Sequence, residues 1–456
     1  MLHVGSQQCL TSRSRRELLK VGLLPLLGLA GGNSLLAEQE ATPERSGARA
    51  KSIILLWLWG GPSHVDTFDL KPQAPLEYRG PYAPIATQTP GIQICELLPR
   101  IAKCSSLYSI IRSLHATSND HGIAGTIGLT GSEAGGISLG GQTNTGQLQP
   151  THGAIVSKIL GFSPDMPRFV TIGQHLHQGH KAIAGEGGGA LGALHDPFRV
   201  DYSLEAGIQL PHLELQDGMT PSGLDARREL LRGIDTLARE IERAPDVTRL
   251  EAFYEQAFAL LTNPRSRAAF DLDEESDQTR RRYGKFRFGQ CCLLARRLIE
   301  ADAGFVQVNW SSHVEPVEDT GDGGWDMHDR NFQQFQDRHA WMLDQSLSAL
   351  LGDLHERGLL ESTVVVAVGE FGRTPKINGK SGRDHWHQCY SGLIAGGGLQ
   401  SGKVIGASDP LAEFPVETPV TPADLFLTAL HQVGIGTPEL TGAGLLPLGS
   451  PVEGLL

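Results

Sequence analysis

Cysteine is scarce in this chain, with six in 456 residues. Five of them lie beyond residue 37, namely Cys95, Cys104, Cys291, Cys292 and Cys389. An odd number without paired spacing argues against a disulfide framework and against a zinc site built from cysteines.

Positive charge is also in deficit. Lys and Arg number 39 against 51 Asp and Glu, a formal net charge of −12, and no long basic stretch follows the N-terminus. This balance disfavours a nucleic-acid partner. The glycine-rich stretch 185–192, "GEGGGALG", lacks the order of a phosphate-binding loop or of a dinucleotide fingerprint, which argues against a nucleotide cofactor.

Long hydrophobic runs are missing too. The segment "SRRELLKVGLLPLLGLAGG" places Arg15 and Arg16 ahead of an apolar stretch that is too short and too glycine-interrupted for a comfortable membrane span. It predicts a twin-arginine (Tat) signal peptide over residues 1–37, with small residues around Ala30 and Ala37 for cleavage. The alternative is a basic segment before an ordinary apolar helix. Export by the Tat machinery would place residues 38–456 in the periplasm or outside the cell, without a stable membrane span.

Six apolar runs recur at wide intervals and alternate with helix-patterned segments. Continuous rather than alternating apolar runs indicate strands in a sheet that is covered on both faces, and the alternation with helices predicts an α/β layered sandwich. A charged, helix-patterned segment at about 200–285 is interpreted as an insertion. The predicted strands are 52–59, 107–114, 168–173, 304–310, 363–368 and 391–397.

Four of these runs are followed by histidines and carboxylates. Ligand sites in open α/β sheets form beyond the carboxyl ends of strands. Histidine nitrogens and carboxylate oxygens are ligands of zinc, manganese or iron, and the lack of paired cysteines favours a catalytic over a structural metal. Any one of these residues could instead be a turn or helix-cap residue. The candidate metal ligands are His64, Asp66, His115, Asp326, His328, Glu370, Asp384 and His385.

Arg373 has two possible roles within "GEFGRTP". Its planar guanidinium could hold a substrate oxyanion such as phosphate or sulfate. Equally, Arg373 could pair with Glu370 or Asp384 and pin the loop. The residues alone leave both open.

Several motifs together resemble the bacterial family called domain of unknown function 1501. They include "WGGPSHVDTFDLKP", "RSLHATSNDHGIAGTIGLTG", "GGWDMHDRNF", "GEFGRTPKIN", "GRDHW" and "AGGGLQSGKVIGASD", in this order, within about residues 50–435. That family looks like a branch of the alkaline phosphatase and sulfatase superfamily. The resemblance implies a three-layer α/β/α sandwich of the alkaline phosphatase-like type over residues 38–456, with the helical insertion.

The resemblance also implies roles for individual residues. Acidic ligands expected after the first strand are absent, with His64 and Asp66 as the nearby substitutes. His121 falls where the superfamily carries its nucleophile, and the Cys-x-Pro-Ser-Arg pattern is missing, so the chain is not expected to be a formylglycine sulfatase. Glu370 takes an acidic ligand position, and the remaining ligand positions fall on Asp326, His328, Asp384 and His385.

Two functions fit these expectations. The first is an exported hydrolase of phosphate, sulfate or related esters, acting on a small molecule or a glycan. It would use one or two divalent ions (zinc, manganese, iron or calcium), with Arg373 and His121 as catalytic residues and a metal-activated water as the attacking group. Ser63, Thr117 and Ser118 are fallback nucleophiles. The second is a non-catalytic binding or scaffold protein of the cell envelope that keeps the sandwich.

Overall fold

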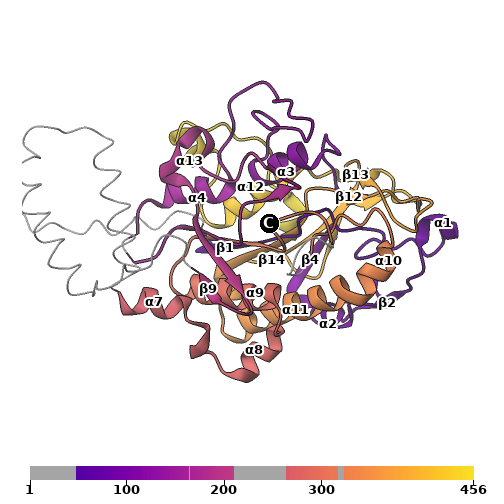
Figure 1. The fold of residues 1–456 in the computed structure, drawn as a ribbon, viewed down its shortest axis with the longest axis horizontal. Helices are drawn as coiled ribbons and strands as arrows, with labels where there is room; N and C mark the ends of the chain where they lie inside the picture. The colour runs from indigo at the N-terminus through magenta and orange to yellow at the C-terminus, as the bar shows by residue number, and fades with distance from the viewer. Residues whose placement is uncertain (1–47, 164, 210–262, 317–322) are drawn as a thin grey trace, which may run out of the picture. The chain divides into compact units, whose positions relative to one another are not determined.

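A nine-stranded mixed sheet forms the centre of the protein (Figure 1). The computed structural model describes residues 48–163, 165–209, 263–316 and 323–456, which fall in one compact unit, and the predicted signal peptide lies outside them. In the order in which they pair, the strands are β15 (Val404–Ile405), β4 (Tyr108–Leu114), β14 (Tyr390–Gly396), β11 (Thr363–Val368), β1 (Ser52–Trp57), β10 (Phe305–Asn309), β5 (Phe169–Ile172), β8 (Phe198–Ser203) and β9 (Gly207–Gln209).

The central strand β1 shows why its sequence is apolar throughout. All six of its residues are buried, and their side chains point alternately to the two faces of the sheet. Ile54 and Leu56 join one hydrophobic core, whereas Ile53, Leu55 and Trp57 join the other. A strand buried on both faces has no solvent side, so the alternating pattern disappears. The predicted α/β sandwich is therefore confirmed.

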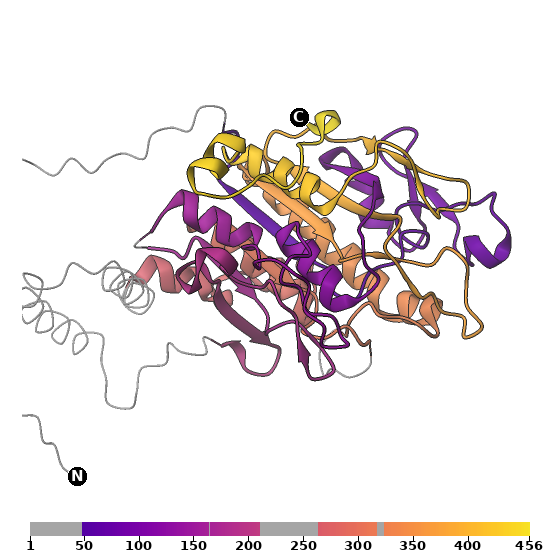
Figure 2. The same cartoon turned by 90° about the horizontal axis from the view of Figure 1, so that it is seen from above.

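Helices cover both faces of the sheet. In Figure 1 one layer lies above the sheet and the other below, and Figure 2 shows the upper layer, with α12 in yellow, lying over the strands. The upper layer contains α3 (His121–Thr130), α4 (His152–Leu160), α12 (Pro422–Gln432) and α13 (Thr437–Gly442). The lower layer contains α2 (Pro99–Lys103), α8 (Asp277–Tyr283), α9 (Arg287–Glu300) and α11 (Ala340–Glu356).

The six predicted strands all form, with bounds within two residues of the expected ones. Helices α8 and α9 are separate, because Gly284 lies between them at φ 102°. The expected insertion at 200–285 begins with the antiparallel pair β8 and β9 rather than with helix. It ends in α7 (Pro264–Phe270) and α8, and residues 210–262 lie outside the described residues.

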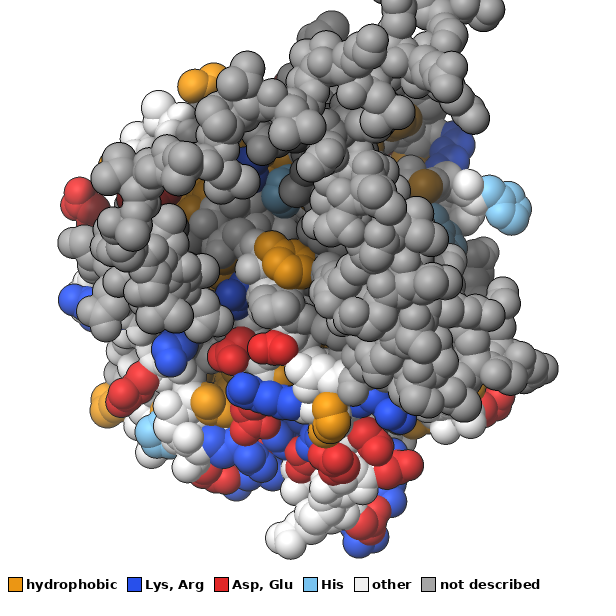
Figure 3. All heavy atoms as spheres, turned by 90° about the vertical axis from the view of Figure 1, so that its left-hand side faces the viewer, with side chains coloured by type: hydrophobic (Ala, Val, Ile, Leu, Met, Phe, Trp, Pro, Cys, Tyr) orange, Lys and Arg blue, Asp and Glu red, His pale blue; other side chains and the backbone are white. Residues whose placement is uncertain are grey.

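Acidic and basic side chains intermingle on the face drawn in Figure 3. Within α7, α8 and their connections, exposed ion pairs join Arg280 to Asp273 and Lys285 to Asp277. Among the described residues on this face, mixed charge of this kind gives no single-sign patch for a polyanion. Within the described part of the chain, no helix is both long enough and apolar enough to cross a membrane.

The ends of the parallel strands define one edge of the sheet. Strands β1, β10 and β11 are mutually parallel, and β4 runs the same way because β14 is antiparallel to both β11 and β4. Their carboxyl ends therefore lie along one edge, where α3 begins and the two-residue strands β12 (Gly372–Arg373) and β13 (His385–Trp386) pair. This edge carries the candidate site.

The buried histidine of α4 makes stability depend on pH. His152 stacks on Phe426 with ring centroids 3.9 Å apart, and burial lowers its pKa from 6.5 to about 3. The unfolded chain therefore binds more protons than the folded chain between pH 6.5 and 3, so this contribution to stability is lost as the pH falls through that window. One histidine changes the free energy of unfolding by about 1.4 kcal/mol per pH unit.

Replacing His152 with phenylalanine should remove this dependence. Between pH 6.5 and 4.5 the variant is expected to lose roughly 2–3 kcal/mol less stability than the wild type. Urea unfolding at the two pH values measures the difference. The same replacement at His431, which is exposed on α12, is the control. Equal losses in the His152 variant and the wild type would show that this side chain is not buried as a neutral imidazole.

Candidate metal centre

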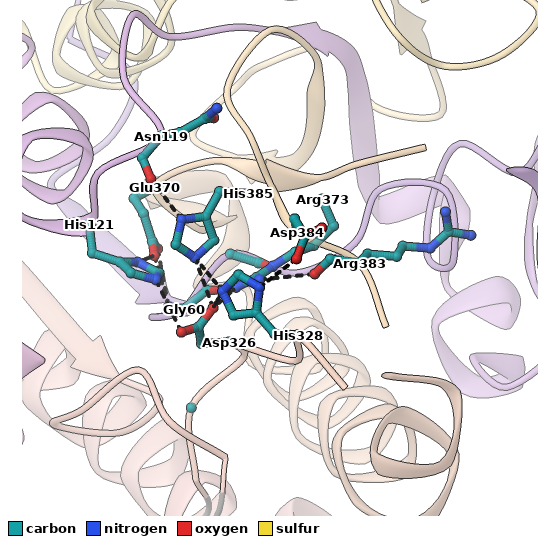
Figure 4. A network of polar contacts seen from close by, with 12 residues as sticks. Gly60, Asn119, His121, Asp326, His328, Glu370, Arg373, Arg383, Asp384 and His385 are labelled. Atoms are coloured by element: carbon teal, nitrogen blue, oxygen red, sulfur yellow. Dashed lines mark hydrogen bonds and ion pairs between the residues drawn. The ribbon is translucent and has the colours of Figure 1, made fainter. Parts of the chain in front are cut away.

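Asp326 lies at the centre of a group of polar contacts (Figure 4). Its segment follows β10 and is pinned to the loop after β1 by a hydrogen bond from Trp325 N to Trp59 O. The next residue of that loop is Gly60, at φ 109°, where a Cβ would lie 2.4 Å from Trp325 N. Only glycine allows this close approach, which brings Asp326 under the end of β1.

His121 reaches Asp326 from the first residue of α3. Asp120 caps the helix by accepting a hydrogen bond from Ile123 N. The Nδ1 of His121 lies 2.6 Å from Glu370 Oε1, and Nε2 lies 3.4 Å from Asp326 Oδ2. Glu370, which follows β11, is itself fixed by Gly60 N at 3.0 Å. The side chains of His121 and Glu370 are fully buried and that of Asp326 is 7% exposed, so the ring of His121 has one well-defined orientation.

His385 and His328 reach Asp326 from the other side. His385 Nδ1 lies 2.7 Å from the carbonyl oxygen of Asn119, and His328 Nδ1 lies 2.8 Å from Asp384 Oδ1. The Nε2 atoms of both rings lie 3.0 Å from Asp326 Oδ1 and 2.9 Å from each other. His385 is largely buried, whereas the His328 side chain is 42% exposed, so this side of the group faces solvent.

The three histidines share one hydrogen-bonding pattern. Carboxylate and carbonyl oxygens only accept hydrogen bonds, so each Nδ1 carries the proton and donates it. Where a ring is neutral, its Nε2 presents a lone pair toward the Asp326 carboxylate, and where it is protonated, its Nε2 donates a hydrogen bond to that carboxylate. Lone pairs that converge at 2.9–3.4 Å repel one another unless protons or a metal cation lie among them. Metal-binding histidines typically have the outer nitrogen anchored in this way.

The ionisation of these groups suits a cation. Burial alone would raise the pKa of Asp326, but the Arg373 guanidinium and hydrogen bonds from the histidines hold it well below its usual range. Burial lowers the pKa of His385 to about 4, against the opposing effect of Asp326. Burial also lowers the pKa of His121, but Asp326 and Glu370 outweigh it and raise the pKa overall. A metal would displace the proton that His121 holds.

The donor atoms are spaced for a small divalent ion. One atom each from His121, Asp326 and His385 lie within 4.8 Å of one another. Ligands at about 2.0–2.1 Å from a tetrahedral zinc lie roughly 3.3 Å apart. The Asp326 oxygens lie 3.0 and 3.4 Å from the two histidine nitrogens, so small movements would close the shell. Two nitrogens and one oxygen fit the donor set of zinc, manganese or iron.

Arg373 is fully buried, and its guanidinium donates to four protein acceptors. Nε donates to Gly61 O at 2.9 Å, Nη1 to Arg383 O at 3.3 Å, and Nη2 to Gly60 O and to Asp326 Oδ1, the latter at 2.6 Å. The pairing partner is thus Asp326, rather than the Glu370 or Asp384 considered from the sequence. Four of the five N–H donors of the guanidinium therefore meet protein acceptors, as expected of an arginine that pins the loop.

The structure brings seven of the ten predicted site residues together, namely Arg373 and six others. The other three lie outside the group. Asp66 binds Arg383, with Nε at 2.8 Å, and His64 Nε2 lies 2.9 Å from Ala412 O. His115 is half-buried, and its backbone N–H bonds to Val420. Their positions give the metal-ligand prediction no support at these three residues. The six are His121, Asp326, His328, Glu370, Asp384 and His385.

Sequence reasoning missed two contributors. Asn119 orients His385 through its backbone carbonyl, and Arg383 fixes Asp66. A backbone contact leaves no trace in residue type, so Asn119 gave no signal. Arg383 stands inside the quoted motif "GRDHW", where its proximity to two candidate ligands was an available signal.

The fold and this group of residues together define an α/β sandwich protein with a candidate divalent metal site at the carboxyl edge of its sheet. A family model described as "Protein of unknown function (DUF1501)" matches residues 50–445, so the chain belongs to that family. The family predicted from the motifs is therefore confirmed. No curated protein matches the sequence.

Solved structures are similar to this chain only at low identity. The lipoteichoic acid synthase LtaP from Listeria monocytogenes is 12% identical, with a TM-score of 0.40 over 91% of this chain and 79% of the other. The PsFucS1 sulfatase from Pseudoalteromonas sp. is 14% identical, with a TM-score of 0.39 over 89% and 71%. The phosphonate monoester hydrolase SpPMH from Silicibacter pomeroyi is 13% identical, with a TM-score of 0.34 over 85% and 73%.

Proposed function

We propose that this protein is a metal-dependent hydrolase of phosphate, sulfate or related esters. The observation that carries the proposal is the convergence of three histidine Nε2 atoms on Asp326, each ring anchored through Nδ1. Burying such a group costs free energy unless it binds something. A divalent ion held there would polarise an ester oxygen and make water a better nucleophile at neutral pH.

The residues have distinct roles in this proposal. His121, Asp326 and His385 hold the ion, and three protein ligands leave room for water or substrate, as in catalytic zinc sites. Glu370 orients His121 and the carbonyl of Asn119 orients His385. Arg373 holds Asp326 in place and keeps it ionised. His328 and Asp384 form the exposed side, from which an ester would approach.

A binding protein without catalytic activity is the second candidate, and one observation favours it. Among the described residues, no hydrogen bond joins Ser63, Thr117 or Ser118 to Asp326 or its histidines. Thr117 bonds to Glu133 instead, at 3.3 Å. Hydrolysis at this site therefore needs water as the attacking group, and without that chemistry the site would only bind its ligand.

Metal-dependent turnover separates the two candidates. Protein stripped with a chelator and reloaded separately with zinc, manganese, iron or calcium should hydrolyse at least one nitrophenyl phosphate monoester, phosphate diester, phosphonate or sulfate. The His385→Ala variant should not, because it lacks one proposed ligand. A wild-type protein that retains the ion and hydrolyses none of these esters would favour the binding protein.

The place of action is also part of the proposal. Arg15 and Arg16 ahead of a short apolar stretch support export through the Tat machinery, to the periplasm or beyond. Because that route carries folded proteins, the ion would be loaded before export. A small-molecule or glycan ester outside the cytoplasm is the corresponding substrate.

A further inference from the structure

A second buried ion pair lies beside the candidate metal centre. Asp66, 1% exposed, accepts hydrogen bonds from Arg383 Nε at 2.8 Å and Nη2 at 3.1 Å, and Arg383 is fully buried. A Cβ added at Gly80 would lie 3.1 Å from Asp66 and 3.2 Å from Arg383, so the pair is closely packed. Removing either partner of such a pair would leave an uncompensated buried charge, so both side chains are needed to keep this arrangement.

Arg383 fixes the loop that carries two residues of the site. Residues 374–384 between β12 and β13 have no helix or strand of their own. Arg383 Nη1 donates to the carbonyls of Thr374 and Pro375, and Nη2 donates to Tyr78 O at 2.8 Å. One side chain therefore closes this loop on itself and ties it to the region after β1. The next two residues in the chain are Asp384 and His385.

Asp66 also holds the segment after β10, which carries Asp326 and His328. The amide of Asn331 donates to Asp66 Oδ2 at 3.0 Å, and this oxygen also accepts from Arg383 Nε. Asn331 is 3% exposed and stands three residues after His328. A single carboxylate therefore connects the segment of His328 with the segment of His385.

We infer that Asp66 is a positioning residue of the metal centre, which sets the placement of His328 against His385 without binding the ion. The Nε2 atoms of these rings lie 2.9 Å apart on Asp326, so a small shift of either segment changes the donor geometry. Residues that orient metal ligands typically change metal affinity 10- to 100-fold when they are replaced. The effect on metal affinity rests on the proposed function, whereas the placement of the two rings does not.

The test compares Asp66→Asn with Asp353→Asn. Asp353 is a matched control because it is also buried, lies 3.0 Å from Arg296 Nε, and belongs to α11 rather than to a site loop. Asparagine at position 66 would turn an amide group toward Arg383 or Asn331. Competition titration with zinc should show about 10- to 100-fold weaker binding for Asp66→Asn, at unchanged stoichiometry, and little change for Asp353→Asn.

A second measurement needs no metal. In protein labelled with ¹⁵N-histidine, Asp66→Asn should shift the ring signals of His328 and His385 and leave those of His152 and His339 in place. If the wild type binds no ion, the proposed function fails, and these signals still decide whether Asp66 positions the rings. If Asp66→Asn does not fold, Asn331→Ala, which keeps the ion pair, should shift the same two signals.

Three outcomes would overturn the inference. Unchanged ring signals for His328 and His385 in a folded Asp66→Asn or Asn331→Ala variant would show that Asp66 stabilises the fold without positioning the two rings. Equal loss of affinity in Asp66→Asn and Asp353→Asn would have the same meaning. A changed ligand count in the absorption spectrum of the cobalt-substituted Asp66→Asn variant would make Asp66 a metal ligand.

Discussion

Replacing Arg373 with leucine is expected to lower the free energy of unfolding by about 3–5 kcal/mol. The change leaves Asp326 buried without its cation and removes donors from the carbonyls of Gly60, Gly61 and Arg383. An unpaired buried charge is among the few causes of losses this large. Chemical denaturation monitored by fluorescence or circular dichroism measures the change.

An exposed arginine of the neighbouring segment serves as the control. Arg330 is 61% exposed and pairs only with Asp329 among the ion pairs of the described residues, so Arg330→Leu is expected to change stability by no more than about 0.5 kcal/mol. If Arg373→Leu were as stable as wild type and lost only turnover, Arg373 would act on the substrate. That is the role in which its guanidinium holds a substrate oxyanion.

Replacing Asp326 with asparagine is expected to weaken metal binding by more than about 100-fold, beyond the range for residues that merely orient ligands. Among the described residues, Asp326 is the one carboxylate that faces all three Nε2 atoms, and an amide is a poorer ligand without negative charge. Affinity is measured by competition with a chromophoric chelator on protein shown to be folded, because Arg373 also loses its partner.

Asp329→Asn is the matched control for this prediction. Asp329 lies three residues along the chain and is 52% exposed, with its carboxylate next to Arg330. Its replacement should leave metal affinity unchanged. If both variants bound the ion as tightly as wild type, the ion would be held elsewhere in the protein.

The edge of the sheet was predictable because strand direction fixes it. Apolar runs mark β1, β10 and β11, and the carboxyl ends of parallel strands must share an edge. Histidines and carboxylates directly after those strands, such as Glu370, therefore had to lie near one another. The sequence alone could identify the neighbourhood for this reason.

The pairing of side chains within that neighbourhood was not predictable. Asp66 and Asp326 both follow sheet strands and both meet a buried arginine, yet only Asp326 also faces histidine nitrogens. The difference depends on loops whose course is set by long-range contacts, such as Arg373 with Gly60 O. Residue type does not encode these contacts, so Asp66 and Asp326 look alike in the sequence.

Metal content of the wild-type protein tests the proposed centre most directly. The chain from residue 38 is purified, dialysed exhaustively at neutral pH and measured by mass spectrometry, alongside a His121→Ala, His385→Ala double variant. We expect close to one zinc, manganese or iron ion per chain in the wild type and almost none in the variant. A folded wild-type protein without a bound ion, or a variant that keeps it, would contradict the assignment of His121, Asp326 and His385 as a metal centre.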